Sequence, residues 1–486
     1  MILQQILQHL NRKDKNLAFF IKEQGYSYAE LRDKIAGIQV LLHQENIQKN
    51  DVVLLNVYND IETYASILAI WFSGATFVPL NPKHAKNRND LIKNQMEVAV
   101  KLSSNSKDIS SIITKDKTSK KAITNKSFSN QILYILFTSG STGIPKGVPI
   151  SEQNLDSFIS DFNAEYSLTK NDKFLQIYDL TFDASIHCYV LPLFLGASVF
   201  TVSPNKIKYL EAYKIMQKHE ITFAKFPPSV LTYLQPFFNK ISLPKLRYSL
   251  LGGESLQVNL AENWQKCVPN AEIHNVYGPT EATINTHIFN FSKKYKPTKS
   301  INGIVSIGKP FGNNKAIVIN ENNVMLPKNT KGELCLAGKQ ITNGYYKNPL
   351  KNRESFFTVN NQKYYKTGDL VIQDNDGDFL FYGRMDSQIQ LQGYRVELSE
   401  IEEIAGKFNT KNNIAVVAVK NKLDANTIIL FVENKNINTK QFHLYLQNNL
   451  PNYMVPSKII TLNTFPQTTS GKIDYNSLKK IARENV

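Results

Sequence analysis

The sequence predicts an α/β fold, because segments typical of buried strands alternate with segments of helical periodicity. Residues 51–59 (DVVLLNVYN) are an apolar run of strand length, and residues 61–72 then show helical spacing. A second strand is expected at 76–80. The succession recurs where ILYILF at 132–137 precedes the helix-like SEQNLDSFISDF. Alternation of this kind is typical of parallel or mixed sheets with covering helices, here in a large N-terminal domain.

The C-terminal part predicts a second, smaller domain. The pattern changes at 382–397 (YGRMDSQIQLQGYRVE), which is polar and interrupted by glycines. After it we expect helices at 399–408 and 440–449, and strands at 413–420 and 427–433. A tail of about 100 residues is large enough for an α+β domain of its own.

Some classes of protein are disfavoured. The first residues, MILQQILQHLNRKDKN, have helical spacing without a basic leader or a cleavage site, so we expect an amphipathic helix that packs on its own domain. No apolar run reaches the ~18 residues of a membrane span, and no membrane partner is expected. Cys188, Cys267 and Cys335 lie far apart, outside any CxxC motif or Cys/His cluster, which argues against disulfides and zinc. A reducing, cytoplasmic setting fits.

The formal charge of +16 raises the question of nucleic-acid binding. The lysines are dispersed, however, and the densest run, residues 115–126 (KDKTSKKAITNK), contains no aromatic residue and is typical of a solvated loop. We therefore expect no nucleic-acid partner. A basic surface would instead help to steer an anionic substrate or an acidic protein partner.

The strongest local feature is a glycine-rich loop after an apolar strand, FTSGSTGIPKGV at 137–148. Glycines let successive backbone N–H groups face an anion, hydroxyls add donors, and Lys146 adds a positive charge. The loop therefore predicts a polyphosphate site. It is not a Walker A motif, because Pro145 stands where that motif requires glycine, and a Rossmann fingerprint is also absent.

Four further turns carry groups suited to ATP: YGPTE at 277–281, YKTGD at 365–369, YGR at 382–384 and SGKID at 470–474. Each is weak evidence alone. Together with the glycine-rich loop, in this order, they resemble the adenylate-forming superfamily of acyl-CoA synthetases, luciferases and amino-acid adenylation domains. The resemblance runs from YSYAEL at 26–31 to SGKID. It implies a small β-barrel-like subdomain in the N-terminal domain and a mobile C-terminal domain.

The resemblance implies ATP as cosubstrate and Mg²⁺ as cofactor. Tyr277 would stack on adenine, while Asp369 and Arg384 would bind the ribose. Glu281 would be the Mg²⁺ ligand, because that ion prefers one or two carboxylates plus phosphate oxygens. Further ATP-binding positions implied are Thr138, Ser139, Gly140, Ser141, Thr142, Gly143, Lys146, Gly252, Gly253, Glu254, Asn275, Gly278 and Thr280.

Lys472 is the implied catalytic lysine, together with Lys146 at the departing pyrophosphate. A carboxylate that attacks the α-phosphate brings two anions together, so a cation between them stabilises the transition state. The resemblance also implies a hinge at Asp386, dividing a large domain 1–385 from a small domain 386–486 that rotates between adenylation and thioester formation.

The segment Leu251–Leu256 (LGGESL) looks like a phosphopantetheine attachment site. Its place shortly before YGPTE is that of the nucleotide-pocket wall in the family, so we expect Ser255 to remain unmodified. No carrier module follows the ligase in the sequence, so the expected partner is a separate phosphopantetheinylated carrier protein.

Asp183 favours an amino acid as substrate, because α-amino-acid domains carry an aspartate here that pairs with the substrate ammonium. A buried carboxylate without a partner would be costly. The alternative is a helix N-cap within TFDAS. The other implied pocket residues are Ala184, His187, Lys225, Leu250, Gly252, Val276, Ile284 and Asn285.

Lys225 and Asn285 could bind a side-chain carboxylate or amide, and Gly252 would leave room for it. Similar sets occur in domains for aspartate, asparagine or glutamate, so an acidic or carboxamide amino acid is favoured. Lys225 could instead point outwards, since it precedes Phe-Pro-Pro, where the register can slip. The alternative is a D-alanine–carrier protein ligase, which usually has a bulkier residue at Gly252. An acyl-CoA synthetase or a non-catalytic relative is less favoured.

Overall fold

The computed structural model describes the chain except for residues 1, 13–14, 106–111, 114–117, 129, 141–143, 204–205, 292–297, 387, 409–412, 423, 434–436 and 469–472. The chain forms two compact units. The larger comprises residues 1–81, 96–137 and 147–385, and the smaller comprises 82–95, 138–146 and 386–486. Two short N-terminal segments thus group with the C-terminal residues, while a rotation at Asp386 stays a prediction.

The main sheet of the larger unit has a parallel centre with antiparallel edges. Its nine described strands are, in order, β17 (Lys309–Pro310), β14 (His287–Asn290), β13 (Glu272–Tyr277), β12 (Tyr248–Gly252), β11 (Phe223–Phe226), β9 (Lys173–Gln176), β10 (Ser198–Thr201), β1 (Leu17–Ile21) and β2 (Gln24–Ser27). The run from β13 to β1 is parallel, whereas β2, β14 and β17 pair antiparallel. Because carboxyl ends of parallel strands share one edge, residues at the ends of β11, β12 and β13 lie near one another.

A second, mostly parallel sheet carries the strands expected at 51–59, 76–80 and 132–137. In order it contains β6 (Ile112–Ile113), β5 (Val98–Ser103), β3 (Val52–Asn56), β4 (Thr76–Leu80), β7 (Ile132–Thr138) and β8 (Lys146–Ser151). Pairs from β6 to β7 are parallel. Every residue of β3 and β4 is buried, as is typical of parallel strands covered on both faces.

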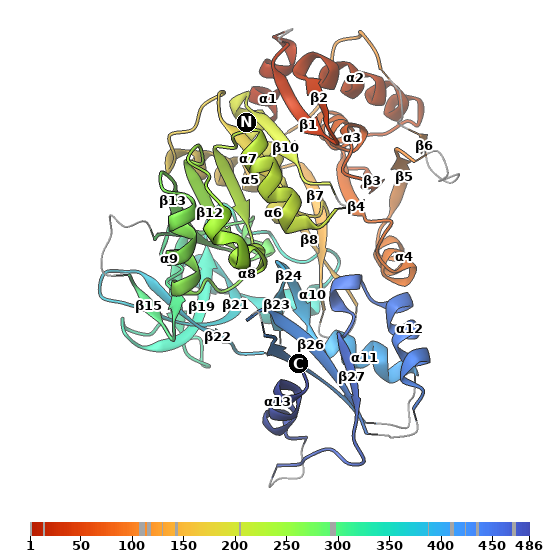
Figure 1. The fold of residues 1–486 in the computed structure, drawn as a ribbon. Coiled ribbons are helices and arrows are strands. Elements are labelled where there is room, and N and C mark those ends of the chain that lie inside the picture. Colours follow the sequence, from red (N-terminus) through yellow and green to blue (C-terminus); the bar gives the residue numbers. More distant parts are fainter. Residues whose placement is uncertain are drawn as a thin grey trace. The chain divides into compact units, whose positions relative to one another are not determined.

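Helices cover these sheets in the larger unit: α1 (Ile2–Asn11), α2 (Tyr28–Gln44), α3 (Ile61–Phe72), α5 (Glu152–Ala164), α6 (Asp183–Leu195), α7 (Lys208–Lys218), α8 (Pro228–Leu234) and α9 (Val258–Cys267). In Figure 1, α9 lies beside β12 and β13, with which it shares a core. Helix α1 buries the apolar face expected from its spacing. Helix α6, which packs on β9 and β10, ends where Gly196 adopts a φ of +74°, a conformation that favours glycine. The α/β fold class is thus confirmed.

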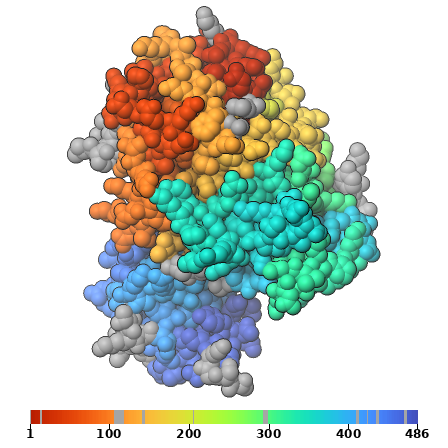
Figure 2. Space-filling view, turned by 180° about the vertical axis from the view of Figure 1, so that it is seen from behind, coloured from red at the N-terminus to blue at the C-terminus, as the bar shows by residue number. Residues whose placement is uncertain are grey.

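The expected β-barrel-like subdomain is an antiparallel half-barrel. Its described strands are β18 (Lys315–Ile319), β19 (Lys331–Ala337), β21 (Gln362–Gln373), β20 (Phe356–Val359) and β22 (Phe379–Arg384), the last paired with β21. Helix α10 (Pro349–Ser355) leads into β20. Seen from behind, this segment forms one continuous surface, coloured turquoise in Figure 2.

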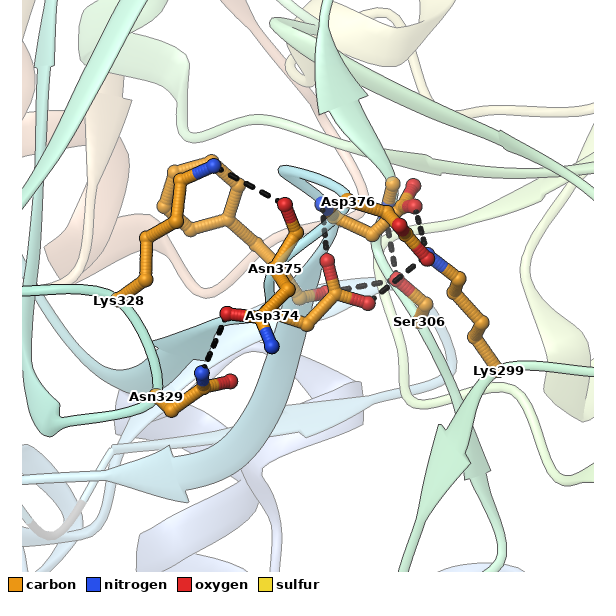
Figure 3. Close-up of polar contacts among 10 residues, drawn as sticks. Lys299, Ser306, Lys328, Asn329, Asp374, Asn375 and Asp376 are labelled. Carbon is orange, nitrogen blue, oxygen red and sulfur yellow. Dashed lines mark hydrogen bonds and ion pairs between the residues drawn. The ribbon is translucent and has the colours of Figure 1, made fainter.

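One lysine ties the β21–β22 hairpin to the segment before β15 (Ser300–Ile301), which pairs with β16 (Ile304–Val305). Lys299 Nζ donates to Asp374, Asp376 and Asp378 at 2.9, 2.7 and 2.6 Å (Figure 3). Although partial burial opposes the shift, these three hydrogen bonds raise the pKa of Lys299 above its ordinary value. The contacts of Lys299 fix the β21–β22 hairpin, whose strands carry Asp369 and Arg384, two residues that we expect to bind the nucleotide.

The smaller unit has its own cores. The strands β23 (Gln388–Leu391) and β24 (Tyr394–Glu397) form a hairpin, and β25 (Ile414–Lys420), β26 (Asn426–Val432) and β27 (Lys458–Thr461) form a sheet. They are accompanied by α4 (Lys86–Asn94), α11 (Leu398–Phe408), α12 (Thr439–Asn449) and α13 (Tyr475–Glu484). The buried pair Arg88 and Glu400, at 2.9 Å, joins α4 to α11. The expected α+β character of the C-terminal residues is confirmed.

Candidate active site

Strand pairing in the larger unit brings together the three residues expected at the nucleoside. Tyr277 ends β13, and the β21–β22 register places Asp369 opposite Arg384. Arg384 Nη1 donates to Asp369 Oδ1 at 2.6 Å, and the Tyr277 hydroxyl donates to Oδ2 at 2.5 Å. Burial, together with the Asp369 charge, raises the pKa of Tyr277 well above its ordinary value, so the hydroxyl remains a donor. Asp369 is thereby held as a fixed carboxylate.

Gly252 and Gly253, the expected pocket wall, end β12 and begin the following turn. A Cβ on Gly252 would lie 2.4 Å from the carbonyl oxygen of Val276. The glycine is therefore required for the close approach of β12 to β13, while the room that it would leave for a substrate stays a prediction. Gly253 has a φ of +81°, which favours glycine.

Asn275 and Glu254, also expected at the nucleotide, make structural hydrogen bonds. Asn275 Nδ2 donates to the carbonyls of Val305 and Ser306 at 3.3 and 2.9 Å. Glu254 accepts from the backbone N–H of Ser229 at 2.8 Å, in the first turn of α8. Both residues thus fix neighbouring backbone, a role that their motif did not reveal.

Glu281, the expected magnesium ligand, lies in the short 3-10 helix Thr280–Ala282 and is fully buried. Its Oε1 accepts from the Tyr345 hydroxyl at 2.7 Å, and its backbone carbonyl accepts from the Thr342 N–H at 2.9 Å. Among the described residues no group of three or more His, Cys, Asp or Glu could hold a metal ion. A single carboxylate fits an ion that takes its remaining ligands from phosphate and water, as Mg²⁺ does.

Lys225 faces the interior, which answers the question of its register. It lies on β11 and is only 2% exposed. Its Nζ donates to Asn285 Oδ1 at 2.5 Å. Burial lowers the pKa of Lys225 to about 8, although the Cys188 thiol and the Asp183 carboxylate oppose the shift. A buried cation and a carboxamide therefore meet here.

Asp183 is the first residue of α6, whereas the N-cap position is Phe182 and carries no side-chain cap. The interpretation of Asp183 as the N-cap is therefore wrong. Burial raises the pKa of the Asp183 carboxyl, and the Lys225 charge and a hydrogen bond from Thr280 oppose the shift. Ala184 follows it and is partly buried.

His187 lies one turn further along α6 and is 1% exposed. Neither of its ring nitrogens has a hydrogen-bond partner among the residues that the structure describes. The ring meets Phe162 edge-on at 4.4 Å and Phe158 at 5.4 Å between centroids. Burial and the Lys225 charge lower the pKa of His187 well below its ordinary value, so the imidazole is neutral at pH 7. His187 is thus a polar side chain without such a partner, packed against two phenylalanine rings.

The remaining expected pocket residues follow from the register of the main sheet. Lys225 pairs with Leu250 on β12, and Gly252 pairs with Val276 on β13. Since residues two apart on a strand share a face, these four lie on one face of the sheet. The apolar members and Ile284 belong to the main core of the unit. Gly278 is required for contact with the returning loop, since its Cβ would lie 2.6 Å from Asn285 Cα.

The expected phosphate loop belongs to the smaller unit, and its residues Ser141, Thr142 and Gly143 lie outside the described residues. Thr138 ends β7, and Lys146 begins β8. The hydroxyl of Ser139 donates to the Arg395 carbonyl at 3.1 Å. A Cβ on Gly140 would lie 2.1 Å from the Ile144 carbonyl, so the turn requires glycine.

Two expected residues of the C-terminal part remain predictions in their roles. Lys472 lies outside the described residues. Asp386 is described, and its Oδ1 accepts from the N–H of Gln388 at 3.1 Å, which is the hydrogen bond of a local turn.

The segment 340–345 (QITNGY) was not among the expected site residues, and the structure places it against Glu281 and Asn285. Tyr345, Thr342 and Gln340 all bond to residues 281–285. Gly338 precedes the segment and Gly344 lies within it, and these two glycines, whose φ values are +136° and +139°, were the available signal in the sequence.

None of the described helices is both long enough and apolar enough for a membrane crossing. The three cysteines are buried, and each carries a free thiol.

Comparisons with known proteins agree with this fold. The family model for AMP-binding enzymes matches residues 7–346, and the model for the AMP-binding enzyme C-terminal domain matches residues 400–472. The zwittermicin A synthase ZmaJ of Bacillus cereus is 30% identical over 95% of this chain and 91% of its own length. Bacitracin synthase 2 of Bacillus licheniformis is 28% identical over 95% of this chain, which spans only 18% of that protein.

Among solved structures, the adenylation domain AlmE of Vibrio cholerae, in complex with glycyl-adenosine-5'-phosphate, aligns with a TM-score of 0.86. The two are 25% identical over 99% of this chain and 97% of that one. A nonribosomal peptide synthetase protein with adenylation and PCP domains, PA1221, shares the fold with the same TM-score at 20% identity, over 98% of this chain and 83% of that one. The chain therefore belongs to the AMP-binding enzyme family and is an adenylate-forming ligase of the nonribosomal peptide synthetase type.

Proposed function

We propose that the chain activates an amino acid with ATP and passes the aminoacyl group to the phosphopantetheine thiol of a separate carrier protein. The substrate side chain carries a carboxylate or a carboxamide. The observation that carries the proposal is a cluster in which the partly buried Asp183 accompanies the buried Lys225 and Asn285, with His187 beside them.

Asp183 supports an amino acid. A carboxylate withdrawn from water is costly unless a cation compensates it, and the partial burial of Asp183 already raises its pKa. The ammonium of an α-amino acid would supply a second positive charge beside Lys225 and keep Asp183 ionised. The AlmE structure contains a glycyl adenylate, which is consistent with amino-acid substrates among similar enzymes.

Lys225 and Asn285 support a polar substrate side chain. Lys225 remains largely protonated at pH 7, because its pKa is lowered only to about 8. A side-chain carboxylate would accept from Lys225 Nζ and from the Asn285 amide, and a carboxamide would accept from the same donors. The neutral imidazole of His187 offers one more donor or acceptor. An alkyl side chain would offer these groups no hydrogen bond beyond the one that Lys225 already donates to Asn285, which is costly for a charged group in a buried site.

In the first half-reaction, an oxygen of the substrate carboxylate attacks the α-phosphorus of ATP. The bond from that phosphorus to the bridging oxygen breaks, and pyrophosphate leaves. Asp369, with Arg384 and Tyr277, would hold the nucleoside, while Lys146 and Lys472 would neutralise the phosphates. Glu281 would hold Mg²⁺, which when bound supplies positive charge to the phosphate oxygens.

In the second half-reaction, the carrier thiol loses its proton and its sulfur attacks the carbonyl carbon of the adenylate, so that AMP leaves and a thioester forms. The carrier is supported by likeness to a solved protein that contains adenylation and PCP domains. The net charge of +16 is consistent with an acidic protein partner.

ATP–pyrophosphate exchange across the twenty amino acids and D-alanine tests the proposal. We expect exchange with aspartate, asparagine or glutamate above the rest. Exchange with D-alanine alone would identify a D-alanine–carrier protein ligase instead. Exchange with none of them, under conditions where a fatty or aryl acid supports it, would refute the amino-acid assignment.

A further inference from the structure

Gln340 is a fully buried glutamine that follows strand β19, and the proposed reaction gives it no role. Its side-chain amide lies against the loop 282–285, more than fifty residues away in the sequence. That loop leads from Glu281, the proposed Mg²⁺ ligand, to Asn285, the partner of Lys225.

The amide of Gln340 makes hydrogen bonds on both of its sides. Nε2 donates to the carbonyl of Asn285 at 2.8 Å, with longer contacts to the carbonyls of Ala282 and Thr283 at 3.3 and 3.4 Å. Oε1 accepts from Asn314 Nδ2 at 2.6 Å. The Gln340 backbone takes part as well, since its carbonyl accepts from the Thr283 hydroxyl at 2.5 Å.

The loop held in this way has an unfavourable backbone conformation. Thr283 and Ile284 have φ values of +54° and +76°. Both side chains are β-branched, and positive φ is rare for such residues because the Cβ meets the backbone. Strained conformations of this kind persist only where surrounding contacts determine them. The Gln340 hydrogen bonds are such contacts, because they bind the carbonyls on both sides of Ile284.

The conformation has a direct consequence for the pocket. It turns Ile284 into the main core and directs the Asn285 side chain to Lys225, where Oδ1 accepts at 2.5 Å. Asn285 Oδ1 accepts a hydrogen bond from the buried Lys225 ammonium. Asn285 therefore helps to fix the position of the Lys225 charge.

We propose that Gln340 is a positioning residue for amino-acid selection: its amide fixes the strained loop 282–285, so that Asn285 holds Lys225 where a substrate side chain binds. The proposal rests on the proposed function of the pocket. Gln340 touches neither substrate nor ATP, and acts through Asn285 and Lys225.

The test uses Gln340→Met in the full chain, a change that keeps the volume and removes both donor and acceptor. Initial rates of ATP–pyrophosphate exchange are measured with L-aspartate and with L-asparagine as probes. We expect KM for the preferred probe to rise by about tenfold, while KM for ATP changes by less than about twofold, within the range of coupling between contacting residues. A parallel rise of both KM values would overturn the proposal, since it would indicate general loosening.

The matched control is Gln131→Met. Gln131 is also fully buried, directly before β7, and its amide donates to the carbonyls of Trp71 in α3 and of Ala75 at 3.0 and 2.9 Å. This variant should unfold at a lower temperature than the wild type, but the ratio of KM for the preferred amino acid to KM for ATP should not change. A change in that ratio as large as in Gln340→Met would show that selection responds to any buried-amide loss, and the proposal would fail.

Two further results decide the mechanism. In Lys225→Met/Gln340→Met, the second substitution should change KM for L-aspartate by less than about twofold, because coupled residues are not additive. Full additivity would contradict the route through Lys225. A crystal structure of Gln340→Met should show Thr283 or Ile284 leaving positive φ. If the loop 282–285 is unchanged in that crystal structure, the proposed role of Gln340 is refuted. If the wild-type enzyme exchanges with neither L-aspartate nor L-asparagine, the assigned class of substrate side chain is refuted instead, and the crystal structure still tests the role of Gln340.

Discussion

The charge of Lys225 should control the discrimination between an acidic substrate and its amide. L-aspartate and L-asparagine share the α-amino and α-carboxyl groups, so a ratio of their kcat/KM values cancels every effect on those groups. Lys225 is buried and its pKa is lowered to about 8. The ratio of kcat/KM for aspartate to that for asparagine should therefore be constant below about pH 7 and fall as pH rises through 8, where the neutral amine appears.

The size of the fall follows from the contact that is lost. A hydrogen bond to a charged group contributes about 1.5–3 kcal/mol in proteins, which corresponds to a factor of roughly 10–150 in kcat/KM. In Lys225→Met the ratio should be lower than in the wild type at pH 7 and should not change with pH. The assay is ATP–pyrophosphate exchange with each amino acid from pH 6.5 to 9.5. A wild-type ratio that stays constant over this range, or one that Lys225→Met leaves unchanged, would refute the assignment.

Three more predictions concern the nucleotide site and stability. Arg384→Met should raise KM for ATP by about tenfold or more with KM for the amino acid unchanged, in exchange kinetics, because Asp369 would lose a charged partner held at 2.6 Å. Lys299→Met should lower the free energy of unfolding in urea by about 1 kcal/mol at pH 7, since the lysine is partly exposed. Although burial acts to raise the pKa of Asp374, the hydrogen bond from Lys299 lowers that pKa below its ordinary value. The loss of stability should therefore fade as pH falls below about 4, where the carboxylates become protonated. Glu152 is buried, and burial raises the pKa of its carboxyl to about 7. The folded protein therefore keeps the Glu152 proton at pH values where the unfolded chain has lost it, so the stability of the fold decreases as pH rises from about 4.5 to 7. Glu152→Gln should therefore unfold at higher temperature than the wild type at pH 8, with the difference gone at pH 4 in calorimetry.

The sequence was sufficient for the elements of the fold, because its apolar periodicity is local information. The strands at 51–59 and 132–137 and the helix at the N-terminus occur where the pattern predicted them. The side on which Lys225 points was not predictable. Every residue of β11 is buried, so the strand lacks the alternation of apolar and polar residues that would show which face is inside.

The candidate site was predictable where a motif carries its side chains, and not where the role comes from long-range contacts. Tyr277, Asp369 and Arg384 stand in motifs of recognisable composition, and the structure brings them together. The motifs at 365–369 and 382–384, which we expected to be turns, lie instead in strands β21 and β22. Gln340 has no local signal, because the carbonyls that it binds lie 55–58 residues earlier in the chain. Gly252 has a role that its motif did not reveal, because a side chain there would meet Val276 on the neighbouring strand.

The central claim is that this chain makes an aminoacyl adenylate. The most direct measurement is to incubate the enzyme with ATP, Mg²⁺ and an equimolar mixture of the twenty amino acids and D-alanine, trap the adenylate with hydroxylamine, and identify the hydroxamate by mass spectrometry. We predict one dominant aminoacyl hydroxamate, from an amino acid with a side-chain carboxylate or carboxamide. If the active enzyme forms no aminoacyl hydroxamate when ATP is present, the claim is contradicted.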